Sequence, residues 1–274
     1  MIARRSLLAA GAILPFAAQA QVQAQDIGSG QRPLRIGVTA GPHAQVMEKV
    51  REIAARPEGP GQGLAIRIVE FQDYIQPNAA LAAGDLDANS YQHQPFLDQQ
   101  VADRRLPLVA AGKTLIFPIG VYSRRHRSVA DLPAGGRIAI PNDPTNGGRA
   151  LVLLARSGAF TLRGGNDFRA TVADIAENPR RFRIVELEAA QLPRVLDEVE
   201  AASINTNFAI PAGLNPVRDS IALESADSPY ANLIAVRQQD REAAWVRRLV
   251  AAYQTQEVKD FVQATFQGAV VPAF

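Results

Sequence analysis

Short apolar segments alternate with amphipathic helical segments along most of this chain, and that alternation is the strongest constraint on its fold. The strand-like segments are residues 34–38, 64–71, 108–111, 114–123, 137–140, 183–187, 201–204 and 232–236. Helical segments begin near residues 42, 77 and 95 and after the turn at 141–144, followed by others at 171, 191–196, 242–254 and 257–266. Because a helix usually connects neighbouring parallel strands, the pattern predicts an α/β fold of mostly parallel sheets flanked by helices.

The chain contains two such series of alternating strands and helices. Long apolar segments at 115–122 and 232–236 join them. This arrangement predicts two lobes joined by two crossovers, with lobe 1 at residues 34–117 plus 233–274 and lobe 2 at residues 118–232. In open α/β sheets, ligands bind beyond the carboxyl ends of the strands. Polar segments lie at such ends, at 39–43, 89–93, 142–149 and 205–207. We therefore expect a ligand site in the cleft between the lobes.

The first twenty residues have the organisation of a secretory signal peptide. Arg4 and Arg5 precede a small-residue and leucine-rich run at 6–18, and Ala18-Gln19-Ala20 fits the small-x-small cleavage pattern. The run is shorter than the roughly 20 apolar residues that span a bilayer. We predict a signal peptide at 1–20, a flexible leader at 21–33, and a mature protein that is soluble in the periplasm. The paired arginines leave open whether export follows the general or the twin-arginine route.

The composition excludes several classes of function. Loss of the two arginines with the signal leaves 27 basic and 27 acidic residues, so the near-neutral chain gives no reason to expect nucleic acid as a partner. There is no cysteine, which excludes disulfides, thiolate metal sites, cysteine nucleophiles and a lipid-modified cysteine. We expect no lipid anchor, no metal and no cofactor.

One polar segment joins a predicted strand to a helix start and carries an arginine. Residues 137–140 form the strand, and Pro141-Asn142-Asp143-Pro144 supplies turn chemistry. A helix N-terminus presents unpaired N–H groups, Gly147 and Gly148 allow a ligand close to the backbone, and Arg149 adds a planar fork suited to a carboxylate. These features favour an anion site, although an ordinary loop-to-helix junction with a solvated arginine fits the same residues equally well.

Distinctive short motifs occur in order from Leu34 to Phe274. They are Gly-Pro-His at 41–43, Asp-Tyr at 73–74, Ala-Asn at 88–89 with Gln-His at 92–93, Pro-Asn-Asp-Pro-Thr-Asn-Gly-Gly-Arg-Ala-Leu at 141–151, Ile-Asn-Thr-Asn at 204–207, Ala-Gly-Leu-Asn-Pro at 212–216, Asp-Ser-Pro-Tyr-Ala-Asn at 227–232 and Gly-Ala-Val-Val-Pro-Ala-Phe at 268–274. Together they resemble the methionine-binding substrate proteins of ABC importers, the NlpA/MetQ lipoprotein family.

The resemblance implies a two-lobe periplasmic binding protein fold (type II-like) that closes over an amino acid and then docks on a membrane permease. The implied ligand is methionine, as the L or the D enantiomer, or a methionyl dipeptide, and we expect a monomer. In this family pattern Arg149 pairs with the ligand carboxylate and Asn205 or Asn207 holds its polar end. The implied side-chain pocket is lined by Tyr74, Tyr91 and His93, with Asn146 nearby.

The chain departs from the family pattern in two places. It lacks the usual lipidated cysteine, and Ser90-Tyr91 stands where relatives usually have two bulky residues, so we expect Ser90 to change the pocket. Two alternatives follow: a binding protein retuned to another amino acid, or an enzyme on the same fold that acts on a small carboxylic acid. The enzyme would need Glu70 or His93 as its acid or base. His43, His93 and His126 fall in unrelated contexts, which argues against a metal site or a catalytic cluster.

The signal prediction can be tested by N-terminal sequencing of the protein exported by a bacterium with a periplasm. We expect the mature chain to begin at Gln21, because alanines at 18 and 20 supply the small residues that cleavage requires. Ala20→Leu is the control and should suppress cleavage at that bond. A start at Gln25 would indicate cleavage after Ala24 instead, and an exported chain that retains Met1 would contradict the prediction.

Overall fold

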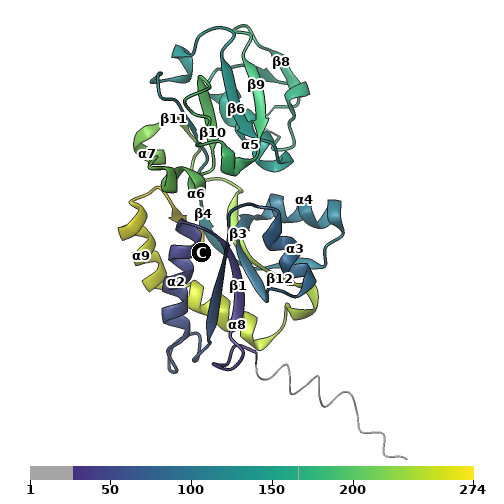
Figure 1. Cartoon of the computed structure of the whole chain (residues 1–274), viewed down its shortest axis with the longest axis vertical. Helices are drawn as coiled ribbons and strands as arrows, with labels where there is room; N and C mark the ends of the chain where they lie inside the picture. Colours follow the sequence, from purple (N-terminus) through teal and green to yellow (C-terminus); the bar gives the residue numbers. More distant parts are fainter. Residues whose placement is uncertain (1–26, 166) are drawn as a thin grey trace, which may run out of the picture.

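The structure, a computed structural model, describes residues 27–165 and 167–274 and has two lobes, each built on one β-sheet (Figure 1). The predicted signal peptide lies outside the described residues. Within the predicted leader, residues 27–33 form a turn in which the Gly28 amide donates to the Arg32 carbonyl at 2.8 Å. The Ala65 amide donates to the Gly28 carbonyl at 2.7 Å, which attaches this turn to the larger lobe.

The larger lobe contains a six-stranded sheet in the order β13-β4-β12-β3-β1-β2. Its strands are β1 (Leu34–Thr39), β2 (Ile66–Phe71), β3 (Ala88–His93), β4 (Leu108–Ile116), β12 (Ala231–Arg237) and β13 (Val271–Pro272). Helices α2 (Pro42–Ala54), α8 (Ala244–Tyr253) and α9 (Gln256–Phe266) cover one face, and α3 (Gln76–Ala83) and α4 (Gln94–Arg104) the other (Figure 1). Buried apolar side chains on both faces make this sheet the core of the lobe.

The smaller lobe contains a five-stranded sheet in the order β11-β5-β10-β6-β9. Its strands are β5 (Gly120–Tyr122), β6 (Arg137–Pro141), β9 (Arg183–Leu187), β10 (Ala201–Ile204) and β11 (Ser220–Leu223), and β7 (Thr161–Leu162) pairs with β8 (Ile175–Glu177) beside it. Its helices are α5 (Pro144–Arg156), α6 (Thr206–Ala209) and α7 (Pro216–Asp219). Helix α6 lies at the junction with the larger lobe (Figure 1).

Both sheets are mixed. Strand β1 is parallel to β2 and β3, and β6 is parallel to β9 and β10, as the alternation predicts. The remaining pairings are antiparallel, because β5 and β12 enter their sheets directly from the other lobe without an intervening helix. The two-lobe α/β fold is therefore confirmed, with antiparallel pairs added where the chain crosses between the lobes.

The first crossover interrupts a segment that we predicted as one strand. The apolar run at 114–123 divides into the end of β4 and the whole of β5, with residues 117–119 between the two sheets. Pro118 cannot donate a ladder hydrogen bond, so it suits a break between strands. The chain returns to the larger sheet between β11 and β12. The lobe limits at 117/118 and 232/233 remain predictions.

The helix predicted at 191–196 is not formed. A single 3-10 turn, η3 (Ala189–Gln191), leads into further turns closed by bonds from Arg194 to Gln191 and from Glu198 to Val195. Pro193 lies inside the segment, and it has no amide hydrogen with which to extend a helix.

Gly147 and Gly148 serve packing, so our expectation that they allow a ligand close to the backbone is wrong. Both lie inside α5, and a Cβ on Gly147 would lie 2.8 Å from the Pro141 carbonyl oxygen. A Cβ on Gly148 would lie 1.8 Å from the carbonyl oxygen of Phe168. The helix start is already capped, because the Asp143 carboxylate accepts from the Asn146 amide at 2.9 Å.

Gly148→Ala should therefore destabilise the protein. The added methyl group would overlap a backbone carbonyl and force α5 away from residue 168, which we expect to lower the free energy of unfolding by about 1–3 kcal/mol. Urea denaturation followed by circular dichroism measures this change. Gly30→Ala is the control, because its Cβ would have no heavy atom within 4 Å. Equal stability of the two variants would contradict the packing role.

Candidate functional site

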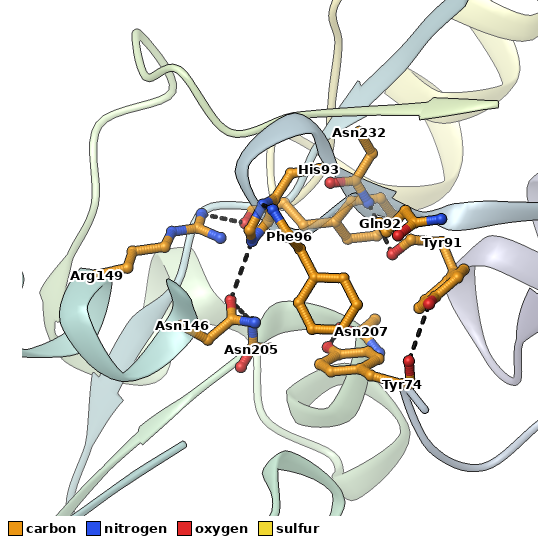
Figure 2. A pocket seen from close by; sticks show the side chains of 11 residues that line it. Tyr74, Tyr91, Gln92, His93, Phe96, Asn146, Arg149, Asn205, Asn207 and Asn232 are labelled. Atoms are coloured by element: carbon orange, nitrogen blue, oxygen red, sulfur yellow. Dashed lines mark hydrogen bonds between the residues drawn. The ribbon is translucent and has the colours of Figure 1, made fainter. Parts of the chain in front are cut away.

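A cavity lies between the lobes, with about 310 Å³ of space free of protein atoms that includes part of the open solvent (Figure 2). The smaller lobe lines it with amides and one cation: Asn146, Arg149, Asn205 and Asn207. The larger lobe contributes mainly aromatic and amide side chains: Tyr74, Tyr91, Gln92, His93, Phe96, Phe117 and Asn232. Every residue that the resemblance implied for the site thus lines one cavity. An apolar wall with a few converging polar groups is typical of a small-molecule site.

A β-bulge in β3 shapes the larger lobe's side of the cavity. Leu233 of β12 pairs with Gln92, but the next residue, Ile234, pairs with Ser90, so Tyr91 is the extra residue of the bulge. The bulge brings Gln92 to the same side of the strand as Asn89, whose Oδ1 accepts from Gln92 Nε2 at 2.9 Å. The Tyr91 hydroxyl donates to the Tyr74 carbonyl oxygen at 2.9 Å. The bulge therefore adds Gln92 to the side chains that this side of β3 presents to the cavity.

Ser90 does not line this cavity, so the expectation that it sets the size of the pocket is wrong. Its buried side chain lies near the hydroxyl of Tyr253 in α8, on the face of the sheet that α8 covers. Burial raises the pKa of Tyr253 above its usual range, so the hydroxyl keeps its proton. Ser90 belongs to the packing between β3 and α8.

His93 bridges the lobes as a neutral imidazole. Its Nδ1 accepts a hydrogen bond from the Phe96 amide at 3.1 Å, so the proton is on Nε2, which donates to Asn146 Oδ1 at 3.2 Å. Burial, and secondarily the charge of Arg149, lowers the pKa of His93 to about 3. Both ring nitrogens are engaged, which makes this side chain a fixed structural donor near neutral pH.

Both ends of the Asn146 amide are engaged by other groups of the protein. Its Nδ2 donates to both carboxylate oxygens of Asp143 at 3.0 Å, and its Oδ1 accepts from His93 and, at 2.8 Å, from Asn205 Nδ2. Burial raises the pKa of Asp143, and the bonds from Asn146 oppose that shift. Asn146 thus links the helix cap to the cavity and orients Asn205.

Two amide atoms beside the cavity are buried without a hydrogen-bond partner among the described residues. They are Asn205 Oδ1, an acceptor, and Asn207 Nδ2, a donor. The other ends of these amides are held, since Asn205 Nδ2 binds Asn146 and Asn207 Oδ1 accepts from the Tyr74 hydroxyl at 2.6 Å. Buried polar atoms in native proteins are almost always paired, so these two favour a ligand with both a donor and an acceptor.

Arg149 is buried and already has a protein carboxylate as its partner. Its Nε donates to Glu224 Oε1 at 2.8 Å, and Nη2 donates to Glu224 Oε2 and, at 2.8 Å, to the Phe117 carbonyl oxygen. The ring of Tyr230 lies over the guanidinium, 4.2 Å from Cζ to the ring centroid. Nη1 makes no hydrogen bond within the described part of the chain. Arg149 therefore keeps one free edge.

Four lining residues were missing from the predicted set: Gln92, Phe96, Phe117 and Asn232. Asn232 lies near the start of β12 and not at the carboxyl end of a strand, where ligand-binding residues were expected. Strand β12 is antiparallel to β3, so its first residues lie beside the carboxyl end of β3, where Asn232 pairs with His93. The rule that ligands bind beyond carboxyl ends would have included Asn232 only if the strand direction had been known.

Over residues 27–165 and 167–274, no group of three or more His, Cys, Asp or Glu side chains is arranged to hold a metal ion. In the same described part of the chain, no helix is long and apolar enough to cross a membrane.

Comparison with known proteins identifies the family. Residues 34–274 match the family model described as NlpA lipoprotein. The chain is 43% identical to the D-methionine-binding lipoprotein MetQ of Escherichia coli K12, covering 89% of this chain and 92% of the relative. It is 53% identical to a solved nutrient-binding protein from Burkholderia cenocepacia bound to methionine, with a TM-score of 0.84 and coverage of 88% and 100%. The chain therefore belongs to the NlpA lipoprotein family.

A second solved structure, of the methionine-binding protein MetQ, is 43% identical, with a TM-score of 0.84 and coverage of 88% of this chain and 98% of that one. The relatives' names include the word lipoprotein, which is at odds with our expectation of a protein without a lipid anchor. The printed sequence contains no cysteine, the residue on which the family usually carries its lipid.

The neutral state of His93 predicts a pH-dependent stability. In the unfolded chain an imidazole titrates near pH 6.5, whereas the folded pKa is about 3, so between these values only the unfolded state binds the proton. The stabilisation is present above about pH 6.5 and decreases as the pH falls toward 3. Replacing His93 by Asn should make the unfolding free energy less pH-dependent, by about 1.4 kcal/mol per pH unit between about pH 6 and 4.

Urea denaturation at a series of pH values measures this slope. His43→Asn is the parallel variant, because burial also lowers the pKa of His43 to about 3, and it should change the slope by a similar amount. A slope for His93→Asn equal to that of the unmodified protein would show that His93 is protonated in the folded state.

Proposed function

We propose that this member of the NlpA lipoprotein family is an extracytoplasmic solute-binding protein that captures methionine between its lobes and delivers it to an ABC transporter permease. One observation carries the proposal. The cavity between the lobes offers an unpaired acceptor on Asn205, an unpaired donor on Asn207 and a free guanidinium edge on Arg149, beside an aromatic wall. These groups are complementary to the ammonium, the carboxylate and the apolar side chain of an amino acid.

The polar contacts divide by charge. Arg149 Nη1 and Asn207 Nδ2 are donors and suit the ligand carboxylate, and Asn205 Oδ1 is an acceptor and suits the ammonium. The Arg149–Glu224 pair has no net charge, so the site suits a zwitterion better than an anion. Asn146 and His93 act on the ligand indirectly, because their own bonds orient Asn205 and hold the lobes together.

The apolar part of the ligand would lie against three aromatic rings. The centroid of Tyr74 is 5.9 Å from those of Tyr91 and Phe96, and Tyr91 and Phe96 are 6.2 Å apart. A thioether interacts favourably with aromatic rings, which supports methionine. Apolar burial alone discriminates poorly, since each methylene contributes only about 0.8 kcal/mol. The choice of methionine therefore rests also on the relatives named for D-methionine and on the methionine-bound neighbour.

We propose that the chain is a receptor and not an enzyme. Glu70, one of the two acid-base candidates, is exposed on β2 and does not line the cavity. His93, the other, uses both ring nitrogens in bonds within the protein. A general base needs a free basic atom within reach of the substrate, which neither residue supplies.

We also propose that export removes residues 1–20, that the protein acts as a monomer, and that residues 34–117 plus 233–274 and residues 118–232 are the two moving lobes. The sheet membership of the strands supports this division, with β12 beginning two residues before the second limit.

Isothermal titration calorimetry tests the ligand assignment. Protein unfolded to remove bound ligand and then refolded should bind L-methionine or D-methionine with one site per chain. Methionine sulfoxide, with a polar group where the aromatic wall lies, is the control and should bind more weakly. Absence of binding to both enantiomers, together with binding of another amino acid, would exclude methionine while leaving the receptor class intact.

Arg149→Ala should weaken methionine binding at least about tenfold, because the ligand carboxylate loses its charged donor. The single variant also leaves Glu224 buried without its partner, so Arg149→Ala/Glu224→Gln is needed to separate binding from folding. The double variant should remain folded by circular dichroism and still bind weakly. Unchanged affinity in a folded double variant would show that the free guanidinium edge does not contact ligand.

A further inference from the structure

The guanidinium of Arg149 lies where the two connections between the lobes meet. The first connection contributes the Phe117 carbonyl oxygen, which accepts from Nη2 at 2.8 Å. The second contributes Glu224 and, six residues later, Tyr230, whose ring lies over the guanidinium. The two connections are also bonded to each other, because the Glu224 amide donates to the Ile119 carbonyl at 3.0 Å. The Ile119 amide donates back to Glu224 Oε2 at 3.3 Å.

Glu224 contacts Arg149 from one side only. Its two oxygens accept from Nε and Nη2, which form one edge of the planar fork. Arg149 lines the cavity (Figure 2), and Nη1 is on the edge of its guanidinium that Glu224 leaves free. A carboxylate of the protein and a carboxylate of a ligand can therefore bind the same guanidinium at once, on different edges. Glu224 does not compete for the ligand's place.

The pair also solves an electrostatic difficulty. The side chain of Arg149 is only 3% exposed and that of Glu224 10%, so neither charge is well solvated by water. An isolated buried guanidinium would be strongly unfavourable before ligand arrives. With Glu224 in place, the cation can remain oriented in the empty cavity, and the ligand does not have to supply its only counter-ion.

We propose that Glu224 is a positioning residue for ligand binding: it holds the Nε and Nη2 edge of Arg149 against the two connections and leaves Nη1 directed at the ligand carboxylate. This proposal rests on the proposed function, in which Arg149 binds that carboxylate. It assigns a role to a residue that lies outside the cavity lining and acts only through Arg149.

Calorimetry with two ligands tests the proposal. Glu224→Gln keeps the side-chain volume but removes the charge and places an amide donor against the donors of Arg149, so methionine affinity should fall about tenfold. Methioninamide, which lacks the carboxylate, should bind the variant and the unmodified protein with affinities within about threefold of each other.

Glu224→Asp, which retains the charge, should recover part of the methionine affinity. Glu200→Gln removes an ion-pairing carboxylate from the same lobe, away from the cavity, and should leave affinity unchanged.

A measurement without ligand separates the two proposals. In ¹⁵N spectra of arginine side chains, the Arg149 Nε–H should exchange slowly with solvent in the unmodified protein and rapidly in Glu224→Gln, with Arg149→Lys used to assign the signal. Failure of the unmodified protein to bind methionine would overturn the proposed function, and the exchange rates would still decide whether Glu224 holds Arg149. Equal exchange rates, equal methionine affinities, or an equal loss for methioninamide would each overturn the role of Glu224.

Discussion

Enclosing polar side chains between two lobes is tolerable only if nearly every polar atom has a partner, and this requirement organises the whole site. Asp143 caps α5 and holds Asn146, which in turn holds Asn205 and accepts from His93 across the cleft. The same rule makes the exceptions informative. Asn205 Oδ1 and Asn207 Nδ2 are buried beside the cavity without a partner among the described residues, which is why we propose them as ligand contacts.

The fold positions this network through its two direct crossovers. A purely parallel sheet would leave the cleft lined by loops after parallel strands alone. Here β12 runs antiparallel to β3, which places Asn232 beside His93, and the bulge at Tyr91 puts Gln92 on the same side of β3 as Asn89. Phe117 lies in the crossover itself. The site therefore draws on backbone irregularities as much as on regular strand ends.

Local patterns predicted much of this from the sequence, and the failures have a common physical cause. Strands at 183–187 and 201–204 have the predicted bounds, and three of the four polar segments at strand ends, 89–93, 142–149 and 205–207, contribute residues to one cavity. The position of Gln92 beside Asn89 depends on a bulge defined by a partner strand more than a hundred residues away in the chain. Glu224 pairs with Arg149 across 75 positions, and nothing near either residue indicates the other. Gly148 likewise has its reason in residue 168, not in its own helix.

Three bonds hold the lobes and their connection together without involving the ligand: Tyr74 to Asn207, His93 to Asn146, and Arg149 to Phe117. Gly41, with φ of 84°, adds close packing against Pro211 of the smaller lobe. Under the proposed function the lobes separate to admit and release ligand, and each contact would then favour the closed form of the empty protein. Observed affinity is the intrinsic affinity scaled by the closed fraction, so such contacts would set how strongly a receptor of given pocket chemistry retains its ligand. Two family members with identical pockets can then differ in how readily they release ligand, because their lobes differ in how readily they separate.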